Sequence, residues 1–584
     1  MMTLFPSGIK NKNFDELNYF SQILNVIWKF KCDIISNFHI TDHLMTDTFY
    51  DPTSGFRFDV HFEPVFKNIE DVYTAQKSKF EAALDLIKRM ENGEIVNHTE
   101  VKAESEDRQV DHYNLRLAEE KVPGKSLAKT LQLWEETLAF ARDCESGKIK
   151  PSKAERYDTI IFNGIGGSYL GPQMLIIAKY GMDYNTTAHL PFKIYFTSNT
   201  DPDLFKNITD NVRLESSIMV HLSKSGTTAE TAGNMHTWME LCASKGLDIG
   251  EHSACVTIKD SKLDKIAHEK HFVRDWHMEV DTGGRTSVCS EIGMAPAAFA
   301  HLDFAQFIRG MSAMDVLTRK TNFNENPAAI IASIINRLSE VEGFKNMIVL
   351  CYSDFMKEYA HYLQQLYMES LGKNYTVKGD EVHVGQTVFG GVGTGEQHAF
   401  MQQVQKGLPD CFVRIIHFEK RSHDFHNEAA GSMGRQLLAF VEGTEKALIQ
   451  NKRPFFDLSF PERNEYNFGM MIALEERIVT FLGSFLGINA YDQPGVQDGK
   501  LAASAVNKLS AAIVKGLENT SVKGTAAEVL KALNIEGQHY EAEAVLNDIY
   551  NNHAVPNAYP TLVNLKAQRE YCPKGKQFIF TFNH

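Results

Sequence analysis

Small hydroxyl residues and one cation gather between two apolar runs, and these residue types suit the binding of phosphate. The first run, Ile218–Leu222, has the length of a strand, and the second, Ala229–Leu241, has the pattern of a helix. Between them stand Ser223, Lys224, Ser225, Gly226, Thr227 and Thr228. A helix N-terminus offers unpaired N–H groups and a positive dipole end, to which hydroxyls add donors. No Gly-Lys-Ser/Thr follows a spaced glycine, so we predict a monophosphate site. An ordinary capped helix is the alternative.

A second loop of small residues, Gly164–Ser168, stands between the strand candidate Tyr157–Asn163 and the helix candidate Leu170–Tyr180. Its spacing partly matches the dinucleotide pattern G-x-G-x-x-G. However, Tyr169 occupies the place of the third glycine, and the downstream acid of such a fold is not evident. We therefore do not predict a nicotinamide cofactor, and we assign the loop, with Ser168, to phosphate binding instead.

Alternating strand and helix patterns predict the elements that position these loops. Strand candidates alternate with helical segments at 192–196, 218–222 and 254–258, and again at 346–352 and 412–418. Such alternation is typical of parallel sheets with helices on both faces. Ligands of these sheets bind at the carboxyl ends of the strands, where both small-residue loops would lie. The loops are thus expected to converge on one phosphate.

The order of these patterns predicts an α/β fold of two doubly wound parallel-sheet domains with additional terminal parts. We place a mostly helical segment at 1–120, the first α/β domain at 121–325, the second at 326–500, and a C-terminal helical arm and tail at 501–584. Glu465–Leu486 is an apolar helix candidate expected to pack centrally. Asn489–Lys500, which contains Pro494, is expected to interrupt the helical pattern.

Two further groups of polar residues are candidates for chemistry. Arg285 follows two glycines in the loop-like segment Asp281–Gly293, which indicates a cation fixed beside closely approaching backbone. A surface arginine on a turn is the alternative. Gln365 and Glu369 are four residues apart in the predicted helix His361–Gly372 and share one face. An ordinary solvent-facing pair is the alternative here.

Two His-x-x-His pairs, at 268–271 and 423–426, raise the question of a metal site. Neither pair has a carboxylate or cysteine partner at ligand spacing along the sequence. We therefore predict no metal site.

The bulk composition restricts partners and compartment. Hydrophobic residues make up 43% and charged residues 23% of the 584 residues, as in globular proteins with a large core. A formal charge of −14 argues against a nucleic-acid surface. The eight scattered cysteines favour reduced thiols over a disulfide framework. No signal peptide and no apolar run of ~18 residues is evident. We expect a cytoplasmic protein that binds neither nucleic acid nor membranes.

Taken together, six separated blocks resemble the glucose-6-phosphate isomerase (phosphoglucose isomerase) family, in that family's order. They read GIGGSYLGP at 164–172, SKSGTTAET at 223–231, GGRTS at 283–287, QLYMESLGK at 365–373, QHAF at 397–400 and DQPGVQDGK at 492–500. One block alone would indicate only a sugar-phosphate-binding fold, whereas six in order are specific.

The resemblance implies two sugar-isomerase (SIS) α/β domains with helical N- and C-terminal extensions. It also implies the reversible isomerisation of glucose 6-phosphate to fructose 6-phosphate, in glycolysis and gluconeogenesis, without a cofactor or metal. The family is homodimeric and shares active sites between subunits. A homodimer that binds a small sugar phosphate is therefore expected.

The same resemblance assigns the site residues. Glu369 would move a proton between neighbouring carbons of a cis-enediolate, and Arg285 would stabilise the enediolate oxygens. His398, reaching in from the other subunit, and Lys500 would open the sugar ring, a role that suits the two protonation states of histidine. Ser168, Ser223, Lys224, Ser225, Thr228, Gln365 and Gln493 would bind the phosphate or support its binding.

The sequence departs from the family at three positions. Glu396 stands where a neutral residue is common, and Pro494 and Gln497 stand where tryptophan and glutamate are common. The added carboxylate of Glu396 either acts on His398 or faces solvent. These departures indicate a divergent branch and leave the catalytic positions intact.

Three other functions compete with this interpretation. An isomerase that also accepts mannose 6-phosphate is compatible with the same residues, although such members are much shorter. A sugar-phosphate sensor would lack the base, the arginine or the histidine, and would need a basic face. An aminotransferase-type isomerase domain would accompany an amidotransferase with a leading cysteine, whereas this sequence starts Met1-Met2-Thr3.

Overall fold

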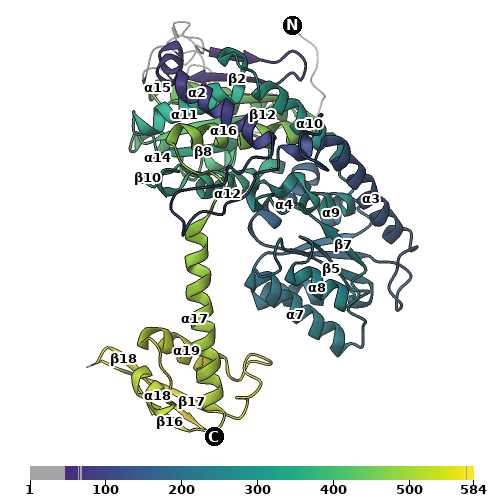
Figure 1. The fold of residues 1–584 in the computed structure, drawn as a ribbon, viewed down its shortest axis with the longest axis vertical. Helices are drawn as coiled ribbons and strands as arrows, with labels where there is room; N and C mark the ends of the chain where they lie inside the picture. The colour runs from purple at the N-terminus through teal and green to yellow at the C-terminus, as the bar shows by residue number, and fades with distance from the viewer. Residues whose placement is uncertain (1–46, 63–64, 66–68, 430, 574) are drawn as a thin grey trace, which may run out of the picture.

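A computed structural model gives the arrangement of the chain (Figure 1). It describes residues 47–62, 65, 69–429, 431–573 and 575–584. Most of the described elements belong to two α/β units, each built on its own sheet, and the C-terminal elements form a third unit carried on one long helix. Of the predicted segment 1–120, residues 1–46 lie outside the described residues. The domain limits near 120, 325 and 500 stay predictions.

The first sheet is all parallel, with five strands in the order β4-β3-β5-β6-β7. Its central strands are buried along their whole length, as in sheets covered on both faces. The predicted strands at 157–163, 192–196, 218–222 and 254–258 are confirmed. The bounds are α3 Leu127–Glu145, β3 Thr159–Asn163, α4 Leu170–Tyr180, α5 Tyr184–Thr187, β4 Lys193–Thr197, α6 Pro202–Asp210, β5 Ser217–Leu222, α7 Ala229–Ser244, β6 Ser253–Thr257, α8 Lys262–Glu269, β7 Arg274–His277 and α9 Glu291–Phe299.

The second sheet has six strands in the order β1-β2-β15-β12-β8-β11. Four of them run parallel, and a hairpin near the start of the described chain adds β2, which pairs antiparallel with β15, and β1, which pairs antiparallel with β2. The bounds are β1 Asp47–Tyr50, β2 Arg57–His61, α2 Ile69–Glu91, α10 Phe304–Thr318, α11 Pro327–Glu340, β8 Asn346–Cys351, α12 Tyr359–Leu371, β9 Lys373–Tyr375, β10 Glu381–Val384, β11 Thr387–Val392, α13 Gly393–Glu396, α14 Met401–Lys406, β12 Cys411–Lys420, β13 His426–Asn427, β14 Gly431–Ser432, α15 Met433–Gln450, β15 Phe455–Glu462 and α16 Glu465–Leu486.

The β1–β2 hairpin was not foreseen in a segment predicted to be mostly helical. Phe58 and Val60 alternate with polar residues in β2, and both are buried beside β15. This alternation has the period of a strand, but it is only a few residues long. The central packing predicted for α16 is confirmed, because nearly all of its residues are buried.

A buried ion network holds α16 to the helices around it. The Asp315 carboxylate of α10 accepts from Arg116 Nε at 2.7 Å and from Arg477 Nε at 3.0 Å. Arg477 also donates to Glu91 at the end of α2, and Arg116 donates to Glu476. Burial alone would raise the pKa of Asp315, but the two guanidiniums outweigh it and hold this pKa well below its ordinary value. Removing one partner from such a network leaves a buried charge unpaired.

The C-terminal unit begins with α17, Pro494–Leu517, which runs out from the body in Figure 1. The predicted interruption at 489–500 is wrong for its second half, because Pro494 takes the first turn of this helix, where its missing N–H costs nothing. The tail that was predicted to follow the C-terminal helices is a pair of strands instead. Residues 566–583 form two strands of a three-stranded sheet, whose core is separate from that of the body. The bounds are β16 Val522–Gly524, α18 Ala526–Ala532, α19 His539–Asn552, β17 Lys566–Cys572 and β18 Gln577–Asn583.

Candidate active site

Two loops rich in small residues lie side by side at the carboxyl edge of the first sheet. Strand β3 leads into residues 164–168 and its parallel neighbour β5 leads into residues 223–228, with Asn163 opposite His221 at the ends of the two strands. A Cβ on Gly164 would lie 3.0 Å from the Cβ atoms of both Leu222 and Ser168. The structure therefore brings Ser168 and the 223–228 loop to one edge.

The 223–228 loop forms a tight turn in front of α7. Ser223 Oγ accepts a hydrogen bond from the N–H of Gly226 at 3.1 Å, and the hydroxyls of Ser225 and Thr227 are 2.6 Å apart. Gly226 has a φ of +69°, and a Cβ there would lie 2.5 Å from the backbone nitrogen of Leu263. Thr228 is the N-cap of the 16-residue α7, and its side chain makes no capping hydrogen bond. The turn thus presents hydroxyls and helical N–H groups to an anion.

Lys224 links this turn to the segment that carries Arg285. Its Nζ donates to the carbonyl oxygen of Thr282 at 3.1 Å. Burial, together with the nearby cation of Arg108, lowers the pKa of Lys224 to about 8. A bound phosphate would supply the opposite charge that favours the ammonium form. Lys224 is therefore suited to hold a dianion.

Arg285 lies where three segments of the chain meet. Its side chain is only 5% exposed, and burial lowers its pKa against the opposing charges of Glu369 and Asp492. Its guanidinium donates to two backbone carbonyl oxygens, those of Ala490 at 2.7 Å and Asp492 at 2.9 Å. It also donates to three side chains, Ser370 Oγ at 2.7 Å, Gln493 Oε1 at 3.1 Å and Glu369 Oε2 at 3.4 Å. The surface-turn alternative for Arg285 is wrong, because this guanidinium is buried and fixed on several sides.

Glu369 and Gln365 share one face of α12, as their spacing predicts. Gln365 Nε2 donates to Glu369 Oε1 at 3.3 Å, and the Glu369 side chain remains 26% exposed. A Cβ on Gly166 would lie 2.9 Å from Gln365 Nε2, and one on Gly167 would lie 1.8 Å from Gly284 O. The glycines of the first loop thus allow it to pack between α12 and the Arg285 segment.

A second buried ion pair fixes α12 on the body. Arg414 of β12 and Glu475 of α16 form two hydrogen bonds of 2.7 and 2.6 Å, and both side chains are fully buried. Tyr359 and Tyr367 of α12 donate to the same carboxylate, at 3.2 and 2.6 Å. Because both tyrosines belong to the helix that carries Glu369, this network sets the position of that carboxylate.

Glu369 opens onto a cleft of about 770 Å³. Its lining includes Glu369, Lys373, His383, Gln493 and Pro494. The sequence interpretation missed Lys373 and Asp492, whose buried side chains pair at 3.3 Å. Burial lowers the pKa of Lys373 to about 8, with Arg285 adding to the shift. Both residues belong to the matching blocks, but only the fold shows that Lys373 lines the cleft beside Glu369 and is paired there with Asp492.

Two of the expected site residues are not gathered with Glu369. His398 is exposed in the turn between α13 and α14, and within the described part of the chain no hydrogen bond or ion pair joins it to Glu369 or Arg285. Lys500 falls on α17, but its side chain is outside the described residues. The residues that do lie together are the partly exposed carboxylate of Glu369, the fixed cation of Arg285 and the 223–228 loop, which is suited to phosphate. Together they can bind a phosphorylated substrate and move one of its protons.

Comparisons with known proteins agree with this geometry. The sequence profile described as phosphoglucose isomerase matches residues 68–525. A glucose-6-phosphate isomerase of Gloeothece citriformis is 35% identical over 505 residues, which cover 85% of this chain and 90% of that protein. One of Synechococcus elongatus is 32% identical and covers 89% of this chain and 93% of its own length.

Solved structures show the same similarity in three dimensions. The crystal structure of a glucose-6-phosphate isomerase from Chlamydia trachomatis superimposes with a TM-score of 0.69 at 26% identity, covering 78% of this chain and 89% of that one. A hypothetical protein from Thermus thermophilus shares the fold, with a TM-score of 0.63 at 22% identity, covering 77% of this chain and 99% of that one.

Proposed function

This chain belongs to the phosphoglucose isomerase family and interconverts glucose 6-phosphate and fructose 6-phosphate, and we propose that it does so at the cleft beside Glu369. The observation that carries this proposal is the convergence of three segments. The 223–228 loop, the Arg285 segment and α12 are joined by the Lys224–Thr282 and Arg285–Glu369 contacts. One region therefore offers both a phosphate anchor and a base.

The phosphate anchor is the part of the site that sets the register of the substrate. Ser223, Lys224, Ser225 and Thr228 surround the start of α7, and Ser168 lies on the adjacent loop. Gln365 stands between this anchor and the base, four residues before Glu369, and among the described residues its Oε1 has no hydrogen-bond partner. The amide nitrogen Nε2 carries two hydrogens, one of which faces Glu369, and we assign the other, with Gln493, to the support of the bound phosphate end.

Glu369 acts as the proton shuttle in this proposal. Once the ring is open, its carboxylate takes the proton from carbon 2 of glucose 6-phosphate and returns it to carbon 1, through a cis-enediolate. The fixed guanidinium of Arg285 lies 3.4 Å from Glu369 Oε2 and favours the negative charge that develops on the enediolate oxygens. The net change is an internal transfer of hydrogen, so the reaction needs no redox cofactor.

Ring opening requires a group that carries a proton between the ring oxygen and the anomeric hydroxyl. We assign this step to His398 with Lys500. The exposed position of His398, away from Glu369 of its own chain, is what a residue that serves the site of a second subunit requires. The active enzyme is accordingly proposed to be a homodimer.

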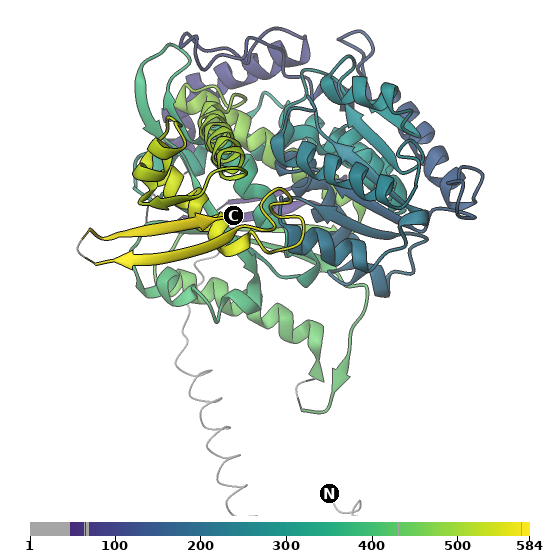
Figure 2. The ribbon, with the colours of Figure 1, turned by 90° about the horizontal axis from the view of Figure 1, so that it is seen from below.

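An exposed apolar face supports the homodimer. Met433, Leu437 and Phe440 follow one another at helical spacing on α15, with Leu438 beside them, and all are 36–56% exposed. Phe425, just before the β13–β14 hairpin, is 70% exposed. Figure 2 shows this hairpin and the start of α15 projecting from the body. An apolar surface of this kind marks an interface between subunits.

Phe440→Asp is expected to convert the dimer to monomers and to abolish most of the activity, because a charge cannot be buried unpaired at an apolar interface and each site would lose its partner histidine. Sedimentation velocity and the isomerase assay measure both effects. Val316→Asp, at another exposed apolar position of 59% exposure, is the matched control and should remain dimeric. Fully active monomers would contradict the shared site.

Two features of the chain bear on the compartment in which the protein works. No helix within the described residues is long and apolar enough to cross a membrane. All seven cysteines that the structure describes are free, which suits a reducing compartment. We propose that the enzyme works in the cytoplasm, in glycolysis and gluconeogenesis.

A coupled assay tests the function. Purified protein receives fructose 6-phosphate, and glucose 6-phosphate is followed through an added dehydrogenase, with mannose 6-phosphate offered in a parallel reaction. Rapid formation of glucose 6-phosphate supports the proposal. If folded protein binds the sugar phosphate without turnover, the isomerase assignment fails and a sensor is favoured.

In the same assay, Arg285→Lys should lower kcat/KM about 10²–10³-fold, as for the loss of an oxyanion donor. Lysine keeps the charge, but it cannot reproduce the planar fork that contacts Ala490, Asp492 and the site together. The matched control is Arg89→Lys at an exposed Arg–Glu pair, which should change kcat/KM by less than about twofold. Full activity of Arg285→Lys would remove Arg285 from the catalytic group.

A further inference from the structure

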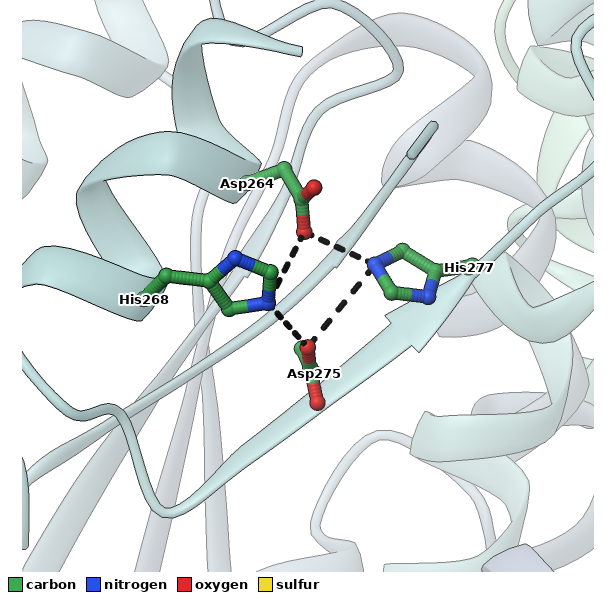
Figure 3. Close-up of side chains that lie close together, drawn as sticks. All are labelled: Asp264, His268, Asp275 and His277. Atoms are coloured by element: carbon green, nitrogen blue, oxygen red, sulfur yellow. Dashed lines mark hydrogen bonds and ion pairs between the residues drawn. The ribbon is translucent and has the colours of Figure 1, made fainter. Parts of the chain in front are cut away.

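Four potential metal ligands meet on the first α/β unit, at the edge strand of its sheet. Asp264 and His268 are four residues apart on α8, and Asp275 and His277 are two residues apart on β7. Both spacings place each pair on one face of its element. One ligand atom from each of the four lies within 4.8 Å of all the others. Figure 3 shows the two imidazole rings and the two carboxylates facing a common centre.

The distances around this centre suit a tetrahedral ion. His277 Nε2 lies 2.7 Å from Asp264 Oδ1 and 3.7 Å from Asp275 Oδ2. His268 Nε2 lies 3.1 Å from Asp275 Oδ2 and 3.8 Å from Asp264 Oδ1. Bonds of about 2.0–2.1 Å to zinc separate tetrahedral ligands by about 3.3 Å. Four of the six separations straddle that value and the other two stay within 4.8 Å, so shifts of the side chains would bring all four ligands to one ion.

Hydrogen bonding accounts for only two of these four contacts, His277 with Asp264 and His268 with Asp275. A neutral imidazole has one hydrogen at most on Nε2, so each ring can satisfy one carboxylate, whereas each Nε2 here faces two. A divalent cation at the centre contacts all four ligands and balances the two negative carboxylates. In the rest of the described chain, histidine–carboxylate pairs such as His301–Glu145 do not gather the further ligands that a metal site needs.

A backbone hydrogen bond fixes the carboxylate of Asp264 beside the two histidines. The side chain is only 2% exposed, and its Oδ2 accepts from the backbone N–H of Asp260 at 2.7 Å. Its Oδ1 is thereby aimed at the two histidines. Hydrogen bonds of this kind orient the ligands of metal sites.

We propose that Asp264, His268, Asp275 and His277 bind one zinc ion, which fastens α8 to the edge strand β7. Strand β7 is the last strand of its sheet and has a neighbour on one side only. The residue before Asp264 is Leu263, whose backbone supports the phosphate turn at Gly226. The ion would therefore stabilise the element on which that turn rests, without touching the substrate.

The sequence does not reveal this site, because the His-x-x-His pattern pairs His268 with His271. The exposed His271 is not a member of the cluster, and the real partner on α8 is Asp264, one turn before His268. The two ligands on β7 belong to another element, so no spacing along the chain joins them to α8. The prediction of no metal here is thus replaced by a proposed site.

Metal titration of the full chain, freed of any purification tag and stripped with a chelator, tests the proposal. We expect one equivalent of Zn²⁺ per chain by elemental analysis, a rise in the thermal midpoint with Zn²⁺, and with Co²⁺ the strong visible absorption of tetrahedral coordination. His277→Ala and Asp275→Asn should each weaken Zn²⁺ binding at least about tenfold. Glu145→Gln, in the histidine pair outside the cluster, should bind as the wild type does.

The wild-type titration decides the matter even if a variant fails to fold. Binding of less than half an equivalent, or octahedral Co²⁺ absorption, would overturn the proposal. Zn²⁺ binding that is equally strong in Asp275→Asn and His277→Ala would also overturn it. Isomerase activity of the stripped protein is measured alongside, and its persistence at low temperature is expected, because the ion acts on the support of the turn.

Discussion

Glu369→Gln is expected to lower kcat about 10³–10⁴-fold while KM changes by less than about threefold. Glutamine has nearly the shape of glutamate and can keep the contact with Gln365 Nε2 at its remaining carbonyl oxygen. It cannot accept the proton from carbon 2, so the loss falls on the transition state and not on the binding of the ground state. Steady-state kinetics in both directions, with circular dichroism to confirm the fold, measure this effect.

Glu358→Gln provides the matched control for that experiment. Glu358 stands at the N-cap of the same helix and pairs with His361 on the surface. Its loss should change kcat by less than about twofold, because it touches neither the cleft nor Arg285. A Glu369→Gln enzyme with more than a tenth of the wild-type kcat would show that another group moves the proton.

Asp315→Asn is expected to lower the free energy of unfolding of the main body by about 3–5 kcal/mol. Asparagine has no charge, so the buried guanidiniums of Arg116 and Arg477 would lose the carboxylate that both of them contact. Urea unfolding followed by tryptophan fluorescence measures the change. Trp134, Trp238 and Trp276 are buried in the first α/β unit, and no tryptophan follows residue 300, so the signal of these three reports on the main body and not on the C-terminal unit.

The same network predicts how stability depends on pH. The pKa of Asp315 is lowered in the folded state, so its contribution is present above the pKa of the unfolded carboxyl and is lost as pH falls toward the folded value. The wild type should therefore lose more stability on acidification than Asp315→Asn does. Asp210→Asn, at an exposed Lys–Asp pair, is the control and should stay within about 0.5 kcal/mol. If the wild type and Asp315→Asn lost the same amount of unfolding free energy on acidification, the role of the network would be contradicted.

Much of the α/β body can be read from the sequence because its elements are long and their signals agree. Apolar runs of strand length, each followed by small residues and then a helical pattern, gave strands β3, β5 and β6 within one or two residues. The i,i+4 spacing likewise predicted the contact of Gln365 with Glu369. In these places local propensity and tertiary packing favour the same structure.

The sequence failed where a long-range partner decides the structure. The β1–β2 hairpin is a strand pair because β15, almost 400 residues later, offers it an edge. Pro494 and two glycines suggested a break, but proline at the first turn is compatible with a helix that continues to Leu517. Lys373 and Asp492 are more than 100 residues apart in the sequence, so no local pattern predicts their contact.

The long helix α17 has a mechanical consequence. Its first turn follows Gln493, which contacts Arg285, and its far end belongs to the separate core of the C-terminal unit. A helix of 24 residues is about 36 Å long, so a tilt of about 5° moves one end by about 3 Å relative to the other. The helix thus couples the position of the elements after Leu517 to Gln493 and, through Gln493, to Arg285. Contacts made by the elements after Leu517 therefore reach the pair formed by Gln493 and Arg285, although none of those elements lines the cleft beside Glu369.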